Sequence, residues 1–237
     1  MGQTARNAAI HVNGYDLTTY FAEEESTFDS GLEDTTAFGP SVVAKSFTAT
    51  IAEASLMFRG WWTSGAAAVW RVLRDAIATT TKSVVSIWHI GDAVGNSGLA
   101  MQSDLSSLKV PMAVSGALKI EVEFKSSVGE EDVVSLHPFL TQETGAGNGT
   151  TVDNTAATSD GGSAYLQVSD VGTTMTVTIR HSTDNFVGDD TLLGTFAAVT
   201  VDRTVERIVL SGTIKRYVRI AWTQTGNTTF GVALHRN

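Results

Sequence analysis

Residues 35–77 constrain the fold more than any other stretch, because they combine a long strand pattern with an amphipathic helix pattern. Between residues 46 and 51 polar and apolar side chains alternate, which is the period of a strand with one buried face. At residues 52–55 the alternation changes phase, as a β-bulge or a strand break would cause. The bulky pair Trp61–Trp62 is expected to end this strand.

A single helix is predicted at about residues 64–78, with Ser64 in the N-cap position. Val69, Leu73, Ala76 and Ile77 fall on one helical stripe, and the charged residues between them fall on the opposite face. An amphipathic helix needs a surface to cover, and strand patterns dominate the rest of the chain. We therefore expect a mainly β protein with one flanking α-helix.

Strand patterns recur along the whole chain. The clearest is Ala117–Lys125, in which Leu, Ile, Val and Phe alternate with Lys and Glu. After residue 163 turn signals separate six further strands at short intervals, which is typical of a small sandwich or barrel. These strands are Ala164–Val168, Met175–His181, Leu192–Val199, Val205–Leu210, Tyr217–Gln224 and Thr229–His235.

A polar stretch, Ser126–Asp132, separates these patterns into two halves. It predicts a β domain with the helix over residues 1–128 and a second small β-sandwich over 134–237. The Gly- and Thr-rich segment 142–162 is predicted to be an exposed loop.

Residues 22–39 carry six acidic side chains and show no sustained period, so we expect a long acidic loop. Loops of this length are uncommon in compact domains unless they have a function, often an intermolecular one. The alternative is a solvated surface loop without a function, and the length rule alone does not decide between the two.

Composition restricts the classes of function. The chain has 237 residues, no cysteine and a net charge of −9. The lack of cysteine excludes disulfides, a thiol nucleophile and thiolate metal sites. An acidic protein is also poorly suited to holding nucleic acid phosphates. No signal peptide or membrane-spanning segment is recognised, so we expect a soluble protein made in a cytoplasm.

No catalytic or metal-binding constellation emerges from the sequence, so the protein is not expected to be an enzyme or to need a cofactor. The five histidines are scattered without ligand-like spacing: His11, His89, His137, His181 and His235. The run Asp184–Asp190 has some acidic spacing of a Ca²⁺ loop but lacks its order and its final Glu. No metal site is predicted.

Several phrases together resemble the major tail tube protein of long-tailed (siphovirus-type) bacteriophages. They are VNGYDLT at residues 12–18, DTTAFG at 34–39, LMFRGWW at 56–62, and the 117–125 strand. The second half resembles the C-terminal part of similar actinophage-like tail proteins, in the phrases LHP at 136–138, RHSTD at 180–184, LGTF at 193–196 and KRYVR at 215–219.

The resemblance implies a β-sandwich or barrel whose copies form rings, either hexamers or trimers that mimic hexamers. Stacked rings would form the virion tail tube, assembled in the host cytoplasm, through which DNA passes without specific binding. Its implied partners are further copies of itself and the tape measure, terminator and distal tail proteins; no membrane is implied.

Two sets of residues are the candidate sites. The inter-ring or inter-subunit loop would use Glu23, Glu24, Glu25, Phe28, Asp29, Glu33, Asp34 and Phe38. The acidic residues facing the channel would be Glu53, Glu121 and Glu123, although an outer solvated face is an equal alternative.

Other functions remain open from the sequence. The C-terminal half is either an added sandwich that decorates the tube or a second tube-like barrel. A carbohydrate-binding module could use Tyr165, Phe186 or Tyr217. A capsid decoration or tail terminator protein is a further alternative.

Overall fold

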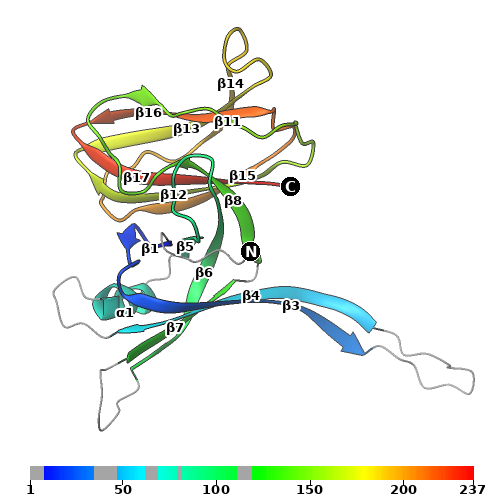
Figure 1. Cartoon of the computed structure of the whole chain (residues 1–237), viewed down its shortest axis with the longest axis vertical. Coiled ribbons are helices and arrows are strands. Elements are labelled where there is room, and N and C mark those ends of the chain that lie inside the picture. Colours follow the sequence, from blue (N-terminus) through cyan, green and yellow to red (C-terminus); the bar gives the residue numbers. More distant parts are fainter. Residues whose placement is uncertain (1–7, 35–46, 62–68, 79–81, 111–118, 127) are drawn as a thin grey trace, which may run out of the picture. The chain divides into compact units, whose positions relative to one another are not determined.

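The computed structural model describes residues 8–34, 47–61, 69–78, 82–110, 119–126 and 128–237, with the backbone alone at 28–34, 47–52 and 76–78. Over these residues the protein is mainly β with one helix, as predicted (Figure 1). The contacts divide it into two compact units. The first comprises residues 1–19, 83–100 and 131–237, and the second comprises 20–82 and 101–130. Both units are built from separated segments, so neither coincides with 1–128 or 134–237.

The second unit is an antiparallel sheet in the order β3-β4-β7-β6, together with the helix. Its elements are β3 (Phe21–Asp34), β4 (Phe47–Trp61), α1 (Val69–Ala78), the part of β6 (Ser97–Lys109) from Met101 onwards, and β7 (Lys119–Ser126). Figure 1 shows β3 and β4 as a long two-stranded ribbon.

The predicted acidic loop at 22–39 is wrong for residues 22–34, which form strand β3. The side chains from Ala22 to Thr27 are exposed apart from Glu24, which is partly exposed. A strand with neither face fully buried has no apolar period, and the hydrogen bonds to β4 rather than burial define it. Residues 35–39, with Phe38, lie outside the described part of the chain.

The phase change in β4 is caused by a bulge, one of the two expected causes, and the bulge lies between Ala49 and Ala52, just before the expected stretch 52–55. Ser30 pairs with Ala52 and Leu32 pairs with Ala49, so β4 has one residue more than β3 in this interval. The strand continues through the bulge and ends at Trp61. Beyond it the even positions Ala54, Leu56 and Phe58 are buried.

The buried face of this sheet is aromatic and aliphatic. Leu56 lies opposite Phe124, and Phe58 lies opposite Val122. The Phe58 ring centroid is 5.1 Å from that of Phe21 and 6.1 Å from that of Phe124. On α1 Val69, Val72 and Leu73 are buried, whereas Arg71, Arg74 and Asp75 are exposed. The predicted helix is therefore confirmed over 69–78, and its amphipathic pattern over 69–75. The side chains of Ala76 and Ile77 and the expected start at Ser64 lie outside the described part of the chain.

The first unit contains two antiparallel sheets. One has the order β15-β12-β17-β8-β6-β5-β1-β2, and the other the order β10-β16-β13-β14, with β11 also paired to β16. The strands are β1 (Ala9–Val12), β2 (Tyr15–Asp16), β5 (Ser83–Trp88), β8 (Glu131–His137), β9 (Gln142–Glu143), β10 (Gly147–Asn148), β11 (Val152–Asp153), β12 (Gly162–Val171), β13 (Thr174–Ser182), β14 (Thr191–Thr195), β15 (Val205–Leu210), β16 (Tyr217–Thr225) and β17 (Thr228–Arg236).

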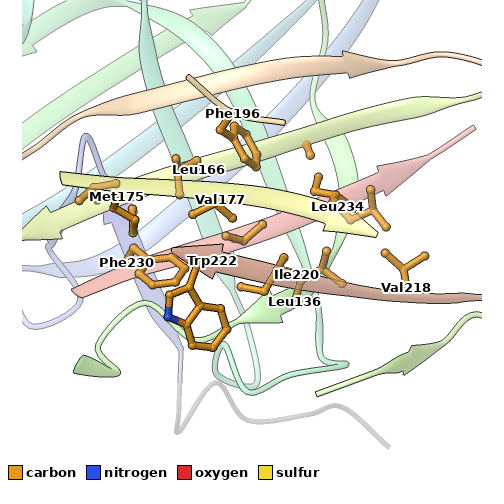
Figure 2. Packing of buried hydrophobic residues seen from close by; sticks show 14 of the residues in the cluster. Leu136, Leu166, Met175, Val177, Phe196, Val218, Ile220, Trp222, Phe230 and Leu234 are labelled. Atoms are coloured by element: carbon orange, nitrogen blue, oxygen red, sulfur yellow. The ribbon is translucent and has the colours of Figure 1, made fainter. Parts of the chain in front are cut away.

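Both sheets contribute to one apolar core in this unit. Leu166 on β12 and Leu234 on β17 belong to the same cluster as Val177 on β13 and Ile220 on β16 (Figure 2). This is the arrangement of a sandwich, in which alternate residues of two sheets interdigitate. The segment 142–162 is not only a loop, because β9, β10 and β11 lie within it. No helix among the described residues has the length and apolarity to span a membrane.

Candidate assembly face on the second unit

From Glu53 to Trp61 the odd-numbered residues of β4 project away from the buried face of the second unit. Residues directly opposite one another in an antiparallel pair share a face, so the register extends this surface across the sheet. Glu23 on β3 lies opposite Arg59, and Arg59 lies opposite Glu121 on β7. Glu121 in turn lies opposite Lys109 on β6.

We call this surface the charged face. Among the residues whose side chains are described, it carries six carboxylates and four cations: Glu23, Glu25, Glu53, Asp104, Glu121 and Glu123 against Arg59, Lys109, Lys119 and Lys125. Acidic groups are therefore in excess, in line with the net charge of the whole chain.

Arg59 connects the acidic residues of β3. Its guanidinium nitrogens lie 3.8 Å from Glu23 Oε2 and 3.4 Å from Glu25 Oε2, and Nη2 donates to Met57 Sδ at 3.0 Å. The Glu23 side chain is 69% exposed, so water screens this pairing and it contributes at most about 1 kcal/mol. These ion pairs hold the side chains of the face near one another but add little to the stability of the fold.

A hollow in the charged face contains an exposed tryptophan. Glu23, Arg59, Trp61, Lys119 and Glu121 line it. Trp61 is 49% exposed, and Lys119 Nζ lies 6.0 Å from its ring centroid. Tryptophan is enriched at contacts between proteins, so Trp61 is a candidate contact residue of this face.

β3 has an unpaired edge. It pairs with β4 from Phe21 to Asp34, and no other strand in the described residues pairs with it. A long exposed edge presents a row of backbone donors and acceptors that can pair with another chain. The second unit therefore combines an open edge with a charged face beside it.

The two predicted sets of site residues meet here. Glu23 and Glu25 from the first set share the charged face with all three residues of the second set. Glu24 lies opposite Phe58 and therefore on the other face. By register Phe28 and Asp29 lie opposite Ala54 and Glu53, and Glu33 and Asp34 lie opposite Thr48 and Phe47. Their roles stay predictions.

Sequence reasoning missed Arg59, Trp61 and Lys119. The alternation of β4 gave a signal for the first two, because Arg59 and Trp61 continue the odd positions that start at Glu53. The pairing of β4 with β7, which brings Lys119 opposite Trp61, has no local signal.

In the acidic run Asp184–Asp190 of the first unit, groups of the protein itself donate hydrogen bonds to the carboxylates. Asp184 accepts from the amides of Val187, Gly188 and Asp189. Hydrogen bonds from Lys215 and Thr183 hold the pKa of Asp189 well below its usual range. Among the described residues, no group of three or more His, Asp or Glu side chains is arranged to bind a metal.

Of the aromatic residues considered for carbohydrate binding, Tyr165 is buried, whereas Phe186 and Tyr217 are partly exposed. Tyr165 is 1% exposed, and its hydroxyl donates to Glu131 Oε2 at 2.5 Å. The Phe186 ring lies 4.0 Å from the Arg219 guanidinium. Tyr165 therefore cannot act as a sugar platform, since it is part of the core.

Glu131 and Arg207 form a half-buried polar network with Tyr165. Arg207 Nη2 donates to Glu131 Oε1 at 2.5 Å, and Arg207 Nε donates to the Tyr165 hydroxyl at 3.1 Å. Burial alone would raise the pKa of Glu131, but the hydrogen bonds from Arg207, Ser163 and Tyr165 outweigh it and lower that pKa. The network is structural, since it fixes β8, β12 and β15 to one another.

No protein-family model matches the chain, and no curated protein matches it. Among solved structures, a chain of the virion of a native gene transfer agent particle aligns with a TM-score of 0.43 and 10% identity, over 55% of this chain and 98% of that one. The SPP1 Dit protein, described as a hub adsorption apparatus of phages that infect Gram-positive bacteria, aligns at 0.40 and 13%, over 97% and 99%. The SPP1 tail tube protein aligns at 0.38 and 13%, over 53% and 74%. These TM-scores are all below 0.5, so the similarities assign neither a function nor a partner to this chain.

Proposed function

We propose that the chain is a structural, non-enzymatic subunit of a long-tailed bacteriophage tail, and that its copies form rings that stack into the tail tube. The observation that carries this proposal is the unpaired β3 edge beside the charged face. The phrases at 12–18, 34–39 and 56–62 resemble major tail tube proteins, and this resemblance is why we propose that the edge joins subunits of a tail tube.

Ring formation would satisfy the open edge. In a closed ring of identical subunits each edge strand finds a partner, and no edge remains for uncontrolled aggregation. A hexamer, or a trimer with pseudo-hexameric symmetry, would both close in this way. The described residues of the first unit contain no helix, unlike the second unit, which favours decoration of the tube over a second tube barrel.

The charged face would line the channel. The far end of the ribbon, where residues 32–34 of β3 pair with residues 47–49 of β4, would contact the next ring. An acidic surface repels phosphates, so DNA would slide past it without binding. On this proposal the subunit resides in the virion tail, with tape measure, terminator and distal tail proteins as its partners.

Electron microscopy of negatively stained, concentrated protein tests the proposal. We expect rings or tubes with a central channel. A strictly monomeric protein at about 1 mM, a concentration at which even weak contacts are populated, would overturn it.

A pair of proline variants tests the role of the β3 edge. N–H groups of successive residues in a strand point to opposite sides, so of Ser26→Pro and Thr27→Pro one removes an outward donor and the other removes a donor to β4. We expect the outward variant to block assembly while keeping the melting temperature of the wild type. If both variants keep the fold and both assemble, the edge is not the joint.

A further inference from the structure

The first unit contains a groove on its surface. It has a volume of about 560 Å³ and lies between the end of β8, the segment 141–150 and Trp222 on β16. Ligand sites in proteins range from about 300 to 1,000 Å³, so the groove is large enough for a small ligand.

Glycines allow the segment to form one wall of the groove. A Cβ at Gly147 would lie 2.7 Å from the Trp222 ring, and one at Gly149 would lie 2.9 Å from Ile220 Cγ1. The backbone of β10 therefore packs directly on the Trp222 ring, which Figure 2 shows at the border of the core beside Phe230. Trp222 Nε1 donates to Gly145 O at 2.9 Å and holds the preceding residues in place.

The polar lining is uncharged apart from a fixed pair. His137 Nε2 lies 3.1 Å from Glu143 Oε1, and His137 Nδ1 lies 3.0 Å from Phe230 O. The ring therefore contacts both the Phe230 carbonyl and the Glu143 carboxylate, and it holds Glu143 at the groove. Thr144, Asn148 and Thr150 add hydroxyl and amide groups.

The charges in the lining decide which ligand chemistry fits. The lining contains Glu143 and no Lys or Arg, so it offers nothing to neutralise a phosphate, a sulfate or a uronate. Hydroxyl and amide groups suit a ligand with many hydroxyls, and the apolar patch of Pro138, Val94 and the Trp222 edge suits its C–H face.

We propose that this groove binds a short uncharged oligosaccharide. The inference does not depend on assembly of the chain into a tail, because every lining residue lies in the first unit. It also differs from binding through exposed aromatic side chains, since Tyr165 lies in the core and the groove uses the edge of Trp222.

Calorimetric titration of the full chain with maltotriose, cellotriose and chitotriose tests the proposal, with trigalacturonate as the anionic comparison. We expect saturable binding of at least one neutral trisaccharide with a Kd of about 1 mM, and none of trigalacturonate. No saturable binding of the neutral sugars up to about 10 mM would overturn the proposal, as would preferential binding of trigalacturonate.

A matched pair of variants places the binding. Ala146 is exposed and lines the groove, whereas Ala157 is exposed in the same unit and does not line it. We expect Ala146→Gln to weaken binding at least tenfold and Ala157→Gln to leave it within about twofold, both with unchanged melting temperatures. Equal affinity in the two variants would show that the sugar binds elsewhere and would overturn the assignment of the groove.

Discussion

Single residues in this chain combine burial with polar chemistry, and His11 on β1 is the clearest case. It is 2% exposed, its ring stacks on Phe139 at 4.2 Å, and its Nε2 lies 3.9 Å from Asp92 Oδ2. Burial lowers the pKa of His11 to about 4, although Asp92 and Asp16 oppose this. The ring is therefore neutral in the folded protein at pH 7.

We predict a loss of stability in acid that depends on His11. Because its pKa is lower in the folded state than the usual 6.5, the unfolded chain binds more protons between these values. The contribution of neutral His11 to the free energy of unfolding is fully present above pH 6.5. It is lost as the pH falls towards 4, by about 3 kcal/mol in all. Urea unfolding at pH 7, 5.5 and 4.5 should show this loss in the wild type and a flatter profile in His11→Gln.

The exposed His89 provides the control for this experiment. His89→Gln measures the effect of removing a histidine that is not buried. A profile in His11→Gln as steep as that of the wild type would mean that other groups cause the acid sensitivity.

At the scale of elements, the sequence predicts those with one buried face. Alternation located β4 and β7, and the helical stripe located α1, because Leu56, Val122 and Leu73 each sit on a buried face. β3 was missed because its described side chains are nearly all exposed. Pairing between distant strands, which brings Glu23, Arg59 and Glu121 onto the charged face, has no local signal at all.

The start of the β3–β4 ribbon depends on a glycine. A Cβ at Gly60 would lie 1.9 Å from Tyr20 O, and the adjacent Trp61 N donates to that oxygen at 3.0 Å. We predict that Gly60→Ala forces the two backbones apart and destabilises the protein by about 2–3 kcal/mol. Hydrogen exchange across residues 21–27, together with the melting temperature, measures the effect.

Gly145→Ala is the matched control, because no atom lies within 4 Å of its added Cβ. It should change stability by less than about 0.5 kcal/mol. Unchanged exchange in Gly60→Ala would show that the ribbon tolerates separation from Tyr20.

At the scale of the whole molecule, the linear order of the chain conceals its division into units. β6 gives its first four residues to the first unit and the remainder to the second. Residues 8–19 belong with the C-terminal strands, because Gly14 N donates to Gln167 Oε1 and Arg203 stacks on the Tyr15 ring at 4.2 Å. A polar stretch in the sequence indicates only where one segment of the chain ends. It cannot show which distant segments pack together, and these contacts join residues more than 150 positions apart.

The net charge of −9 gives the final prediction, which concerns where the negative charge lies rather than its total. If the charged face lines a passage for DNA, its carboxylates prevent phosphates from binding there. Replacing Glu53, Glu121 and Glu123 by Lys reduces the net charge to −3 and makes the face basic. The assembled variant should then retain double-stranded DNA in a salt-dependent manner, with each phosphate contact adding about −0.9 to the slope of log K against log salt.

A second triple variant separates position from total charge. Asp132, Asp160 and Asp170 are exposed in the first unit, and replacing them by Lys gives the same net charge of −3. If the charged face lines the channel, assemblies of the first variant should take up DNA and protect it from nuclease. Assemblies of the second variant should bind DNA only on the outside, where nuclease digests it. Equal protection of DNA by the two variants would place the charged face outside the channel, because only a lumenal charge can hold DNA where the nuclease has no access.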